Sequence, residues 1–261
     1  EIASVPHLRR LWPLLLAGIC VPGCDASAPA ANAASGPDGD AGAPDHAVIL
    51  QYHFVGTETP RITSVTPAEL EAHFDHLDEA GYRVWALDRL LATLREDGEV
   101  PERTVAITFD DGYRSVYTEA YPRLEARGWP FTVFVNTEAI DGGGDDFASW
   151  KQLEEMQADG ALIANHSVSH PYLVRTSREF DDARLDRYLE EEILAAERRI
   201  EARLGVSHRL FAYPFGEYDR RIQRWLADHD FTGIGQHSGP VWTGSDFTAV
   251  PRFPFSGDYA E

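Results

Sequence analysis

Cysteine is scarce in this chain of 261 residues, which has only Cys20 and Cys24. Both precede residue 25, so any domain that folds from about residue 46 onward contains no disulfide and no thiolate. This excludes cysteine nucleophiles and cysteine-ligated zinc sites from that domain.

Positive charge is also scarce. Lys and Arg total 23 against 43 Asp and Glu, which gives a formal net charge of -20. Phosphate affinity depends on clustered Lys and Arg, so nucleic acid is a poor candidate partner and a polyanionic substrate is disfavoured. The acidity is more typical of a solvated surface than of a specific function.

Long apolar runs are absent except near the start, where Arg9 and Arg10 precede the apolar residues 11–21. This run is shorter than the roughly 20 residues of a membrane-spanning helix and matches the apolar part of an export signal. It ends in Val21-Pro22-Gly23-Cys24, which resembles the lipobox of bacterial lipoproteins. We therefore predict that residues 1–24 are a signal peptide of the lipoprotein type; an ordinary cleaved signal is the alternative.

Residues 25–45 are nearly all Ala, Gly, Pro, Ser and Asp. Such a segment cannot bury enough apolar surface to offset its ordering entropy, and we predict a flexible linker. The protein is then expected in the periplasm or cell envelope, anchored to the membrane through a lipid on Cys24 and touching the membrane nowhere else. The folded domain is predicted to span residues 46–261.

Short apolar segments alternate with amphipathic ones from residue 47 onward. Strands are predicted at 47–53, 82–86, 104–109, 131–135, 161–164, 209–213 and 231–235. Helices are predicted at 66–80, 87–95, 115–127, 149–158, 177–204 and 220–229. Such alternation indicates an α/β fold with a parallel sheet, either a (β/α) barrel or a doubly wound sheet. In both, the chemistry lies at the C-terminal ends of the strands.

Two polar clusters follow predicted strands directly. Asp110 and Asp111 come after the strand at 104–109, and His166 and His170 come after the strand at 161–164. The aspartates could simply form a capped strand-to-helix turn, but one of them binding a metal would leave the other free as a base. Asp111, His166 and His170 would supply three ligands and leave positions open for water and substrate, as in catalytic metal sites.

A third cluster, Ala212-Tyr213-Pro214-Phe215-Gly216, ends the strand at 209–213. Taken together, TFDDGY at 108–113, HSVSH at 166–170 and YPFG at 213–216 resemble the three motifs of the polysaccharide deacetylase (NodB-homology) family. The resemblance covers residues 47–255. LQYH at 50–53 and the segment 66–87 are most similar to the branch that deacetylates poly-β-1,6-N-acetylglucosamine.

This resemblance implies a single domain folded as a distorted (β/α)7 TIM-like barrel. It also implies that Asp110 is the general base and that Asp111, His166 and His170 hold one divalent metal, Zn²⁺ first, with Co²⁺, Ni²⁺ or Fe²⁺ as alternatives. The backbone N–H of Phe215 would hold the oxyanion, and Tyr213 and Pro214 would lie beside it at the substrate.

The sequence departs from the family pattern in two places. Ala212 occupies the position of the Arg that orients the base, and Arg252 is the candidate replacement. The motif that supplies a general acid has no clear match, and His237 is the best remaining candidate for that role. His53, at the end of the first strand, could equally line the site or serve as a structural histidine.

These features predict a metal-dependent hydrolase that removes N-acetyl groups from a β-linked N-acetylglucosamine polysaccharide outside the cytoplasm. Within the same class, a peptidoglycan deacetylase or an O-acetyl esterase of another glycan is the alternative. From a different class, a non-catalytic glycan-binding lipoprotein on the same barrel would explain Ala212 but not the base beside an open metal site. A glycosidase is disfavoured, because its two carboxylates would come from separate strand ends.

Overall fold

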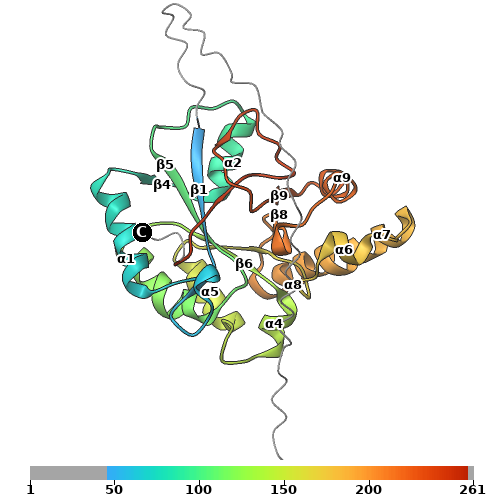
Figure 1. Ribbon diagram of the computed structural model, residues 1–261, viewed down its shortest axis with the longest axis horizontal. Coiled ribbons are helices and arrows are strands. Elements are labelled where there is room, and N and C mark those ends of the chain that lie inside the picture. The colour runs from blue at the N-terminus through green and yellow to red at the C-terminus, as the bar shows by residue number, and fades with distance from the viewer. Residues whose placement is uncertain (1–45, 258–261) are drawn as a thin grey trace, which may run out of the picture. The chain divides into compact units, whose positions relative to one another are not determined.

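Strands and helices alternate along residues 46–257, the part of the chain that the computed structural model describes (Figure 1). The signal peptide and linker predicted for residues 1–45 lie outside the described residues. The parallel strands of the main sheet are β1 (His46–Tyr52), β4 (Arg83–Val84), β5 (Thr104–Phe109), β6 (Thr132–Val135), β7 (Leu162–Asn165), β8 (Leu210–Ala212), β9 (Thr232–Ile234) and β11 (Phe253–Pro254). The seven predicted strands all occur, with ends displaced by at most two residues.

The sheet is a curled one whose ends are joined by a late segment of the chain. Its strand order is β10-β1-β5-β6-β7-β8-β9, with β4 paired to β5 and the short β10 (Val241–Trp242) antiparallel to β1. Val250 forms a parallel bridge with Ile234 of β9, and β11 begins to pair with β1 three residues later. The chain around 250–254 therefore connects β9 back to β1, which confirms the distorted single-domain barrel.

Helices lie around the strands (Figure 1). They are α1 (Pro67–Glu79), α2 (Leu87–Arg95), π-helix η2 (Val116–Ala120), α3 (Tyr121–Arg127), α4 (Thr137–Gly142), α5 (Trp150–Ala158), α6 (Leu173–Ser177), α7 (Asp182–Leu189), π-helix η3 (Glu190–Leu194), α8 (Ala195–Leu204) and α9 (Arg220–Asp228). The capping box expected for α1 is present: the Glu69 backbone N–H donates to Thr66 Oγ1, and the Thr66 N–H donates to the Glu69 carboxylate. None of the helices in this described range is long and apolar enough to cross a membrane.

The single long helix predicted at 177–204 is wrong at its N-terminal end. Residues 173–177 form the separate helix α6, and the Asp181 side chain caps a new start at α7. The helix then passes through η3 before continuing as α8. Short elements such as α4, β10, β11 and the two-stranded sheet of β2 (Phe54–Val55) and β3 (Ser64–Val65) had no periodic signal long enough to predict.

Alternate residues of β5 face opposite sides of the sheet. Val105, Ile107 and Phe109 belong to the apolar cluster that packs under α1, α3 and α5, whereas Ala106 belongs to a second cluster with Phe134 of β6. Because side chains alternate along a strand, Thr108 and Asp110 lie on the same side as Ala106, inside the curled sheet. This parity turns Asp110 inward.

Candidate metal and catalytic site

Two aspartates follow β5 in different environments. Asp110 is completely buried, and its backbone N–H donates to the carbonyl of Tyr52 at 2.9 Å. Asp111 is partly exposed and has a positive φ of 72°, and Gly112 follows at 73°. Two successive left-handed residues turn the chain sharply at the strand end, and a non-glycine residue held there is typical of a functional site.

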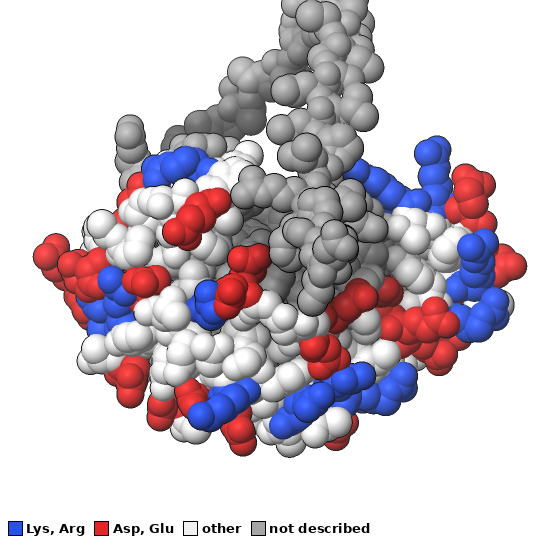
Figure 2. Space-filling model, turned by 90° about the horizontal axis from the view of Figure 1, so that it is seen from below, with Lys and Arg blue, Asp and Glu red and all other residues white. Residues whose placement is uncertain are grey.

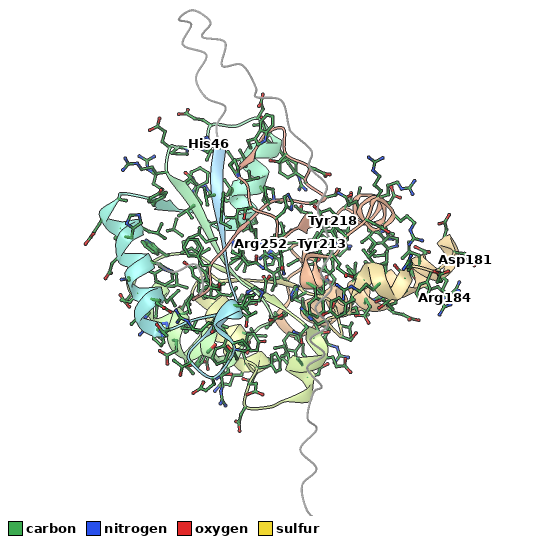
Figure 3. All side chains as sticks on the ribbon, viewed as in Figure 1. His46, Asp181, Arg184, Tyr213, Tyr218 and Arg252 are labelled. Carbon is green, nitrogen blue, oxygen red and sulfur yellow. The ribbon has the colours of Figure 1, made fainter. Side chains whose placement is uncertain are left out.

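The carboxylate of Asp110 is held by a buried guanidinium. Arg252 donates from Nη1 to Oδ1 at 2.7 Å and from Nη2 to Oδ2 at 2.8 Å, and Gln51 Nε2 donates to Oδ2 at 2.7 Å. The Arg252 side chain has no exposed surface and lies among the strands (Figure 3), where its Nε donates to the Gly235 carbonyl at 2.8 Å. Arg252, predicted as a replacement for the missing motif Arg, is thus in bidentate contact with Asp110.

This pairing keeps Asp110 ionised. Burial tends to raise the pKa of its carboxyl, but the charge of Arg252 and smaller effects of His166 and His53 outweigh burial, so the pKa lies well below its ordinary value. The base candidate is therefore ionised at neutral pH.

The two histidines of the second cluster lie on the loop after β7. His166 is completely buried, and its Nδ1 contacts the Ala212 carbonyl oxygen at 2.8 Å. A carbonyl only accepts, so Nδ1 carries the proton and Nε2 of the neutral ring is left with a free lone pair. His170 is reached through a turn in which its own φ is 54°, and its backbone N–H donates to Ser167 Oγ at 2.9 Å.

The π-helix η3 holds this loop in place. A π-turn shifts the backbone pairing of a helix, and such turns are frequent at functional sites. The carbonyl of Glu192 accepts from the Val168 N–H at 2.9 Å, and that of Ile193 accepts from Asn165 Nδ2 at 2.9 Å. The Glu192 carboxylate also accepts from the N–H and the hydroxyl of Ser169. Glu192 and Gln51 are two supporting residues that the sequence analysis missed.

Asp111, His166 and His170 converge as metal ligands would. Asp111 Oδ1 is 3.4 Å from His166 Nε2 and 3.2 Å from His170 Nε2, and the three ligand atoms lie within 4.8 Å of one another. Two ligands of a tetrahedral Zn²⁺, each about 2.0–2.1 Å from the ion, lie about 3.3 Å apart. His166 Nε2 is buried and has no hydrogen-bond partner, which a bound cation would supply. The residues therefore fit a divalent metal.

The electrostatics of the three residues also favour a cation between them. Burial lowers the pKa of His170 to about 4, assisted by repulsion from His166, so its ring is neutral and able to ligate. Burial opposes protonation of His166 too, but the neighbouring carboxylates of Asp111 and Asp110 outweigh it and raise its pKa. A positive charge between these three residues is thus stabilised, and a bound metal ion would supply that charge in place of a proton.

His53 lies at the same site. Its Nε2 is 3.9 Å from Asp110 Oδ2, and one fifth of its side chain is exposed. It is close enough to influence the pKa values of Asp110, Asp111 and His170. Of its two interpretations, lining the site is the one that this position favours.

The third cluster is divided between core and surface. Tyr213 and Pro214 are buried, and the Tyr213 hydroxyl donates to the Thr248 carbonyl at 2.6 Å. Both residues were expected to lie at the substrate, but neither side chain is exposed to a polymer. Phe215 has a φ of 56° and is 45% exposed, with its ring centroid 4.5 Å from that of His170. Only Phe215 of the three borders the open site.

His237 is further out. It is exposed, its Nδ1 is 3.4 Å from the Tyr218 hydroxyl, and it lines a surface hollow together with Phe215. Figure 2 shows acidic and basic groups interspersed over the face of the molecule that it presents. The assignment of His237 as general acid stays a prediction, and the geometry favours His53.

Comparisons with known proteins by sequence and by structure bear on the family and the fold of this chain. The family model for polysaccharide deacetylase matches residues 97–234. YxkH of Bacillus subtilis is 33% identical over 122 residues, which are 47% of this chain and 42% of that protein. The poly-β-1,6-N-acetyl-D-glucosamine N-deacetylase of Escherichia coli K12 is 30% identical over 146 residues, covering 50% of this chain and 22% of the relative. The enzyme of the same name from Staphylococcus epidermidis is 26% identical over 237 residues, covering 82% and 81%.

The chain therefore spans less than half the length of the first two of these curated relatives. Among solved structures, the Streptococcus pyogenes deacetylase PplD in complex with acetate has a TM-score of 0.74 at 21% identity, covering 83% of this chain and 95% of that one. IcaB from Ammonifex degensii has a TM-score of 0.70 at 24% identity, covering 83% and 94%. At these identities the likeness establishes the fold.

Proposed function

The chain belongs to the polysaccharide deacetylase family, and from this premise we propose that it removes N-acetyl groups from a β-linked N-acetylglucosamine polysaccharide. The observation that carries the proposal is the buried, ionised Asp110 directly beside three residues that fit a divalent metal. The names of the Escherichia coli and Staphylococcus epidermidis relatives support a β-1,6-linked polymer as the first substrate to test.

Asp111, His166 and His170 would hold the metal, with Zn²⁺ as the first choice for one carboxylate and two imidazoles. When bound, the ion would polarise the acetamide carbonyl and lower the pKa of a water molecule at the site. Asp110 takes the proton from the attacking water, and Arg252 keeps its carboxylate ionised and oriented. The Phe215 N–H is the proposed donor to the oxyanion.

Cleavage of the C–N bond requires a proton for the departing amine, so that acetate and an amine leave. We propose His53 as the donor, because it is a partly exposed imidazole next to Asp110. A proton that Asp110 has taken from water needs to travel only between neighbouring side chains to reach the leaving nitrogen.

Replacing His53 with Ala is expected to lower kcat by about 100-fold or more, the usual effect of losing a positioned acid. Metal content should be unchanged, because His53 is outside the three ligands. Acetate release and metal analysis measure the two effects, with His208→Ala as a histidine control on the loop before β8. A kcat within threefold of the unmodified protein would exclude His53 as the donor.

The substrate is tested by acetate release from a panel of glycans by the full chain loaded with Zn²⁺. The panel contains β-1,6- and β-1,4-linked N-acetylglucosamine oligomers, peptidoglycan and acetylated xylan. Preference for the β-1,6 oligomers is expected. Preference for peptidoglycan or xylan would establish the alternative deacetylase or esterase, and glycan binding without any release would establish the binding protein.

The proposed place of action is outside the cytoplasm, supported by the signal-like residues 1–24. In bacterial cells that produce the full chain, we expect the protein in the membrane fraction. Cys24→Ala should release it, because the lipid attachment site is lost. Equal fractionation of both forms would contradict the lipid anchor.

A further inference from the structure

A surface hollow of about 510 Å³ opens beside Phe215. Its lining includes Phe215, Glu217, Tyr218, Gln236 and His237, from the chain after β8 and the chain after β9. Its volume is within the range of about 300–1,000 Å³ that is usual for ligand pockets. Tyr218 lies beside the buried Tyr213 (Figure 3), with ring centroids 5.0 Å apart.

The aromatic wall of this hollow is held in one orientation. Phe215 stacks on Tyr172 with ring centroids 3.8 Å apart and planes 9° apart, although both rings are substantially exposed. The guanidinium of Arg175 also lies over the Tyr172 ring, 4.2 Å from its centroid. The stack with Tyr172 thus stabilises the left-handed backbone of Phe215. Because it also fixes the exposed ring in advance, binding of a ligand costs less side-chain entropy.

The polar groups of the hollow are fixed as well. Glu217 is mostly shielded and pairs with Arg175, whose Nε is 2.5 Å from its Oε1. The Tyr218 hydroxyl contacts His237 Nδ1 at 3.4 Å. A carboxylate, an imidazole, a phenol and the Gln236 amide offer both donors and acceptors next to one exposed aromatic ring. Sugar units, which combine hydroxyl groups with apolar C–H faces, suit this combination.

We propose that the hollow is a subsite for the hexosamine unit next to the one that is deacetylated. Phe215 borders both places, since its ring contacts His170 and also lines the hollow. A polymer whose reacting acetamide lies at Asp111, His166 and His170 therefore extends across Phe215 toward His237. This proposal rests on the deacetylase function proposed above, and it gives His237 a binding role in place of acid catalysis.

The kinetic test compares N-acetylglucosamine and its β-1,6-linked oligomers of two to six units as substrates of the full chain and its His237→Ala variant. His237 is exposed, so the variant is expected to fold. Loss of one polar contact should raise KM for the oligomers about three- to tenfold, with kcat and the KM for N-acetylglucosamine itself little affected. His208→Ala serves as the histidine control. A fall in kcat at every length, or no change at any length, would overturn the subsite.

A binding test separates this proposal from the deacetylase function. Calorimetric titration of the metal-free protein with the same oligomers requires no turnover. Affinity should rise with chain length in the unmodified protein and rise less in His237→Ala and Tyr172→Ala. If the protein binds in this way but releases no acetate with metal, the function fails and the subsite stands. If binding is equal in all forms, the subsite fails whatever the activity.

Discussion

Asp110→Asn is expected to lower kcat for acetate release by about 10²- to 10⁴-fold, the range for loss of a general base. The amide keeps the size of the side chain and can still accept from Gln51, but it cannot take a proton from water. Because Asp111, His166 and His170 are unchanged, the variant should still bind one equivalent of metal. Acetate release and metal stoichiometry, measured on the same preparation, separate loss of the base from loss of the site.

The control is Asp228→Asn, which makes the same change at an exposed position on the last turn of α9. It should leave both the rate and the metal content unchanged. Thermal unfolding of both variants shows whether the buried Arg252, now facing a neutral amide, has destabilised the fold. If the folded, metal-loaded Asp110→Asn variant works within threefold of the normal rate, Asp110 is not the base.

Arg252→Met is expected to reduce the free energy of unfolding by about 3–5 kcal/mol, because it leaves Asp110 as an uncompensated buried charge. Both partners of the bidentate pair have no exposed surface, so water cannot replace the guanidinium. Chemical denaturation at pH 7 measures the loss. Arg178→Met, an exposed arginine between α6 and α7, is the matched control and should cost less than about 0.5 kcal/mol.

The pH dependence of this loss has a definite sign. In the unmodified protein the folded-state pKa of Asp110 is lowered, so the pair stabilises the fold above about pH 4 and this contribution is lost as the pH falls through the folded-state pKa. Without Arg252, burial dominates and raises the pKa of Asp110, so protonation stabilises the folded variant as the pH falls. The stability difference between the two proteins should therefore narrow from pH 7 to pH 4.

The double variant Arg252→Met with Asp110→Asn tests the cause. Removing both charges should recover much of the lost stability, because no unpaired charge is left in the core. It should recover none of the activity, because the base is still missing. A loss below about 1 kcal/mol in the single variant, or a difference that widens toward pH 4, would contradict the buried ion pair.

The metal-site geometry was predictable from sequence because its signal is local. Asp110 and Asp111 follow a run of apolar residues that can only be a buried strand, and His166 and His170 follow another. Parallel strands bring their C-terminal ends to one side of a sheet, so the two motifs had to meet. The structure brings Asp111, His166 and His170 together in this way.

The sequence could not show which of the surrounding residues lie next to Asp110 and the metal ligands. Whether His53 or His237 lies nearer to Asp110 depends on how β1 and the chain after β9 are placed in the barrel. The burial of Tyr213 under Thr248 and the support from Glu192 depend on tertiary contacts across 35 and 23 residues. Arg252 was a candidate only because Ala212 stands at the position of the Arg that orients the base in the family. Its contact with Asp110 joins residues 142 positions apart in the sequence.

The central claim is that a single divalent metal at Asp111, His166 and His170 enables Asp110 to drive hydrolysis of an N-acetyl group. The most direct measurement is acetate release from β-linked N-acetylglucosamine oligomers by the full chain, first stripped with a chelator and then titrated with Zn²⁺, in parallel with His166→Ala. We predict no release from the stripped protein, recovery that saturates at one equivalent of metal, and no recovery in His166→Ala. Undiminished release from metal-free protein, or full recovery in the His166 variant, would contradict the account.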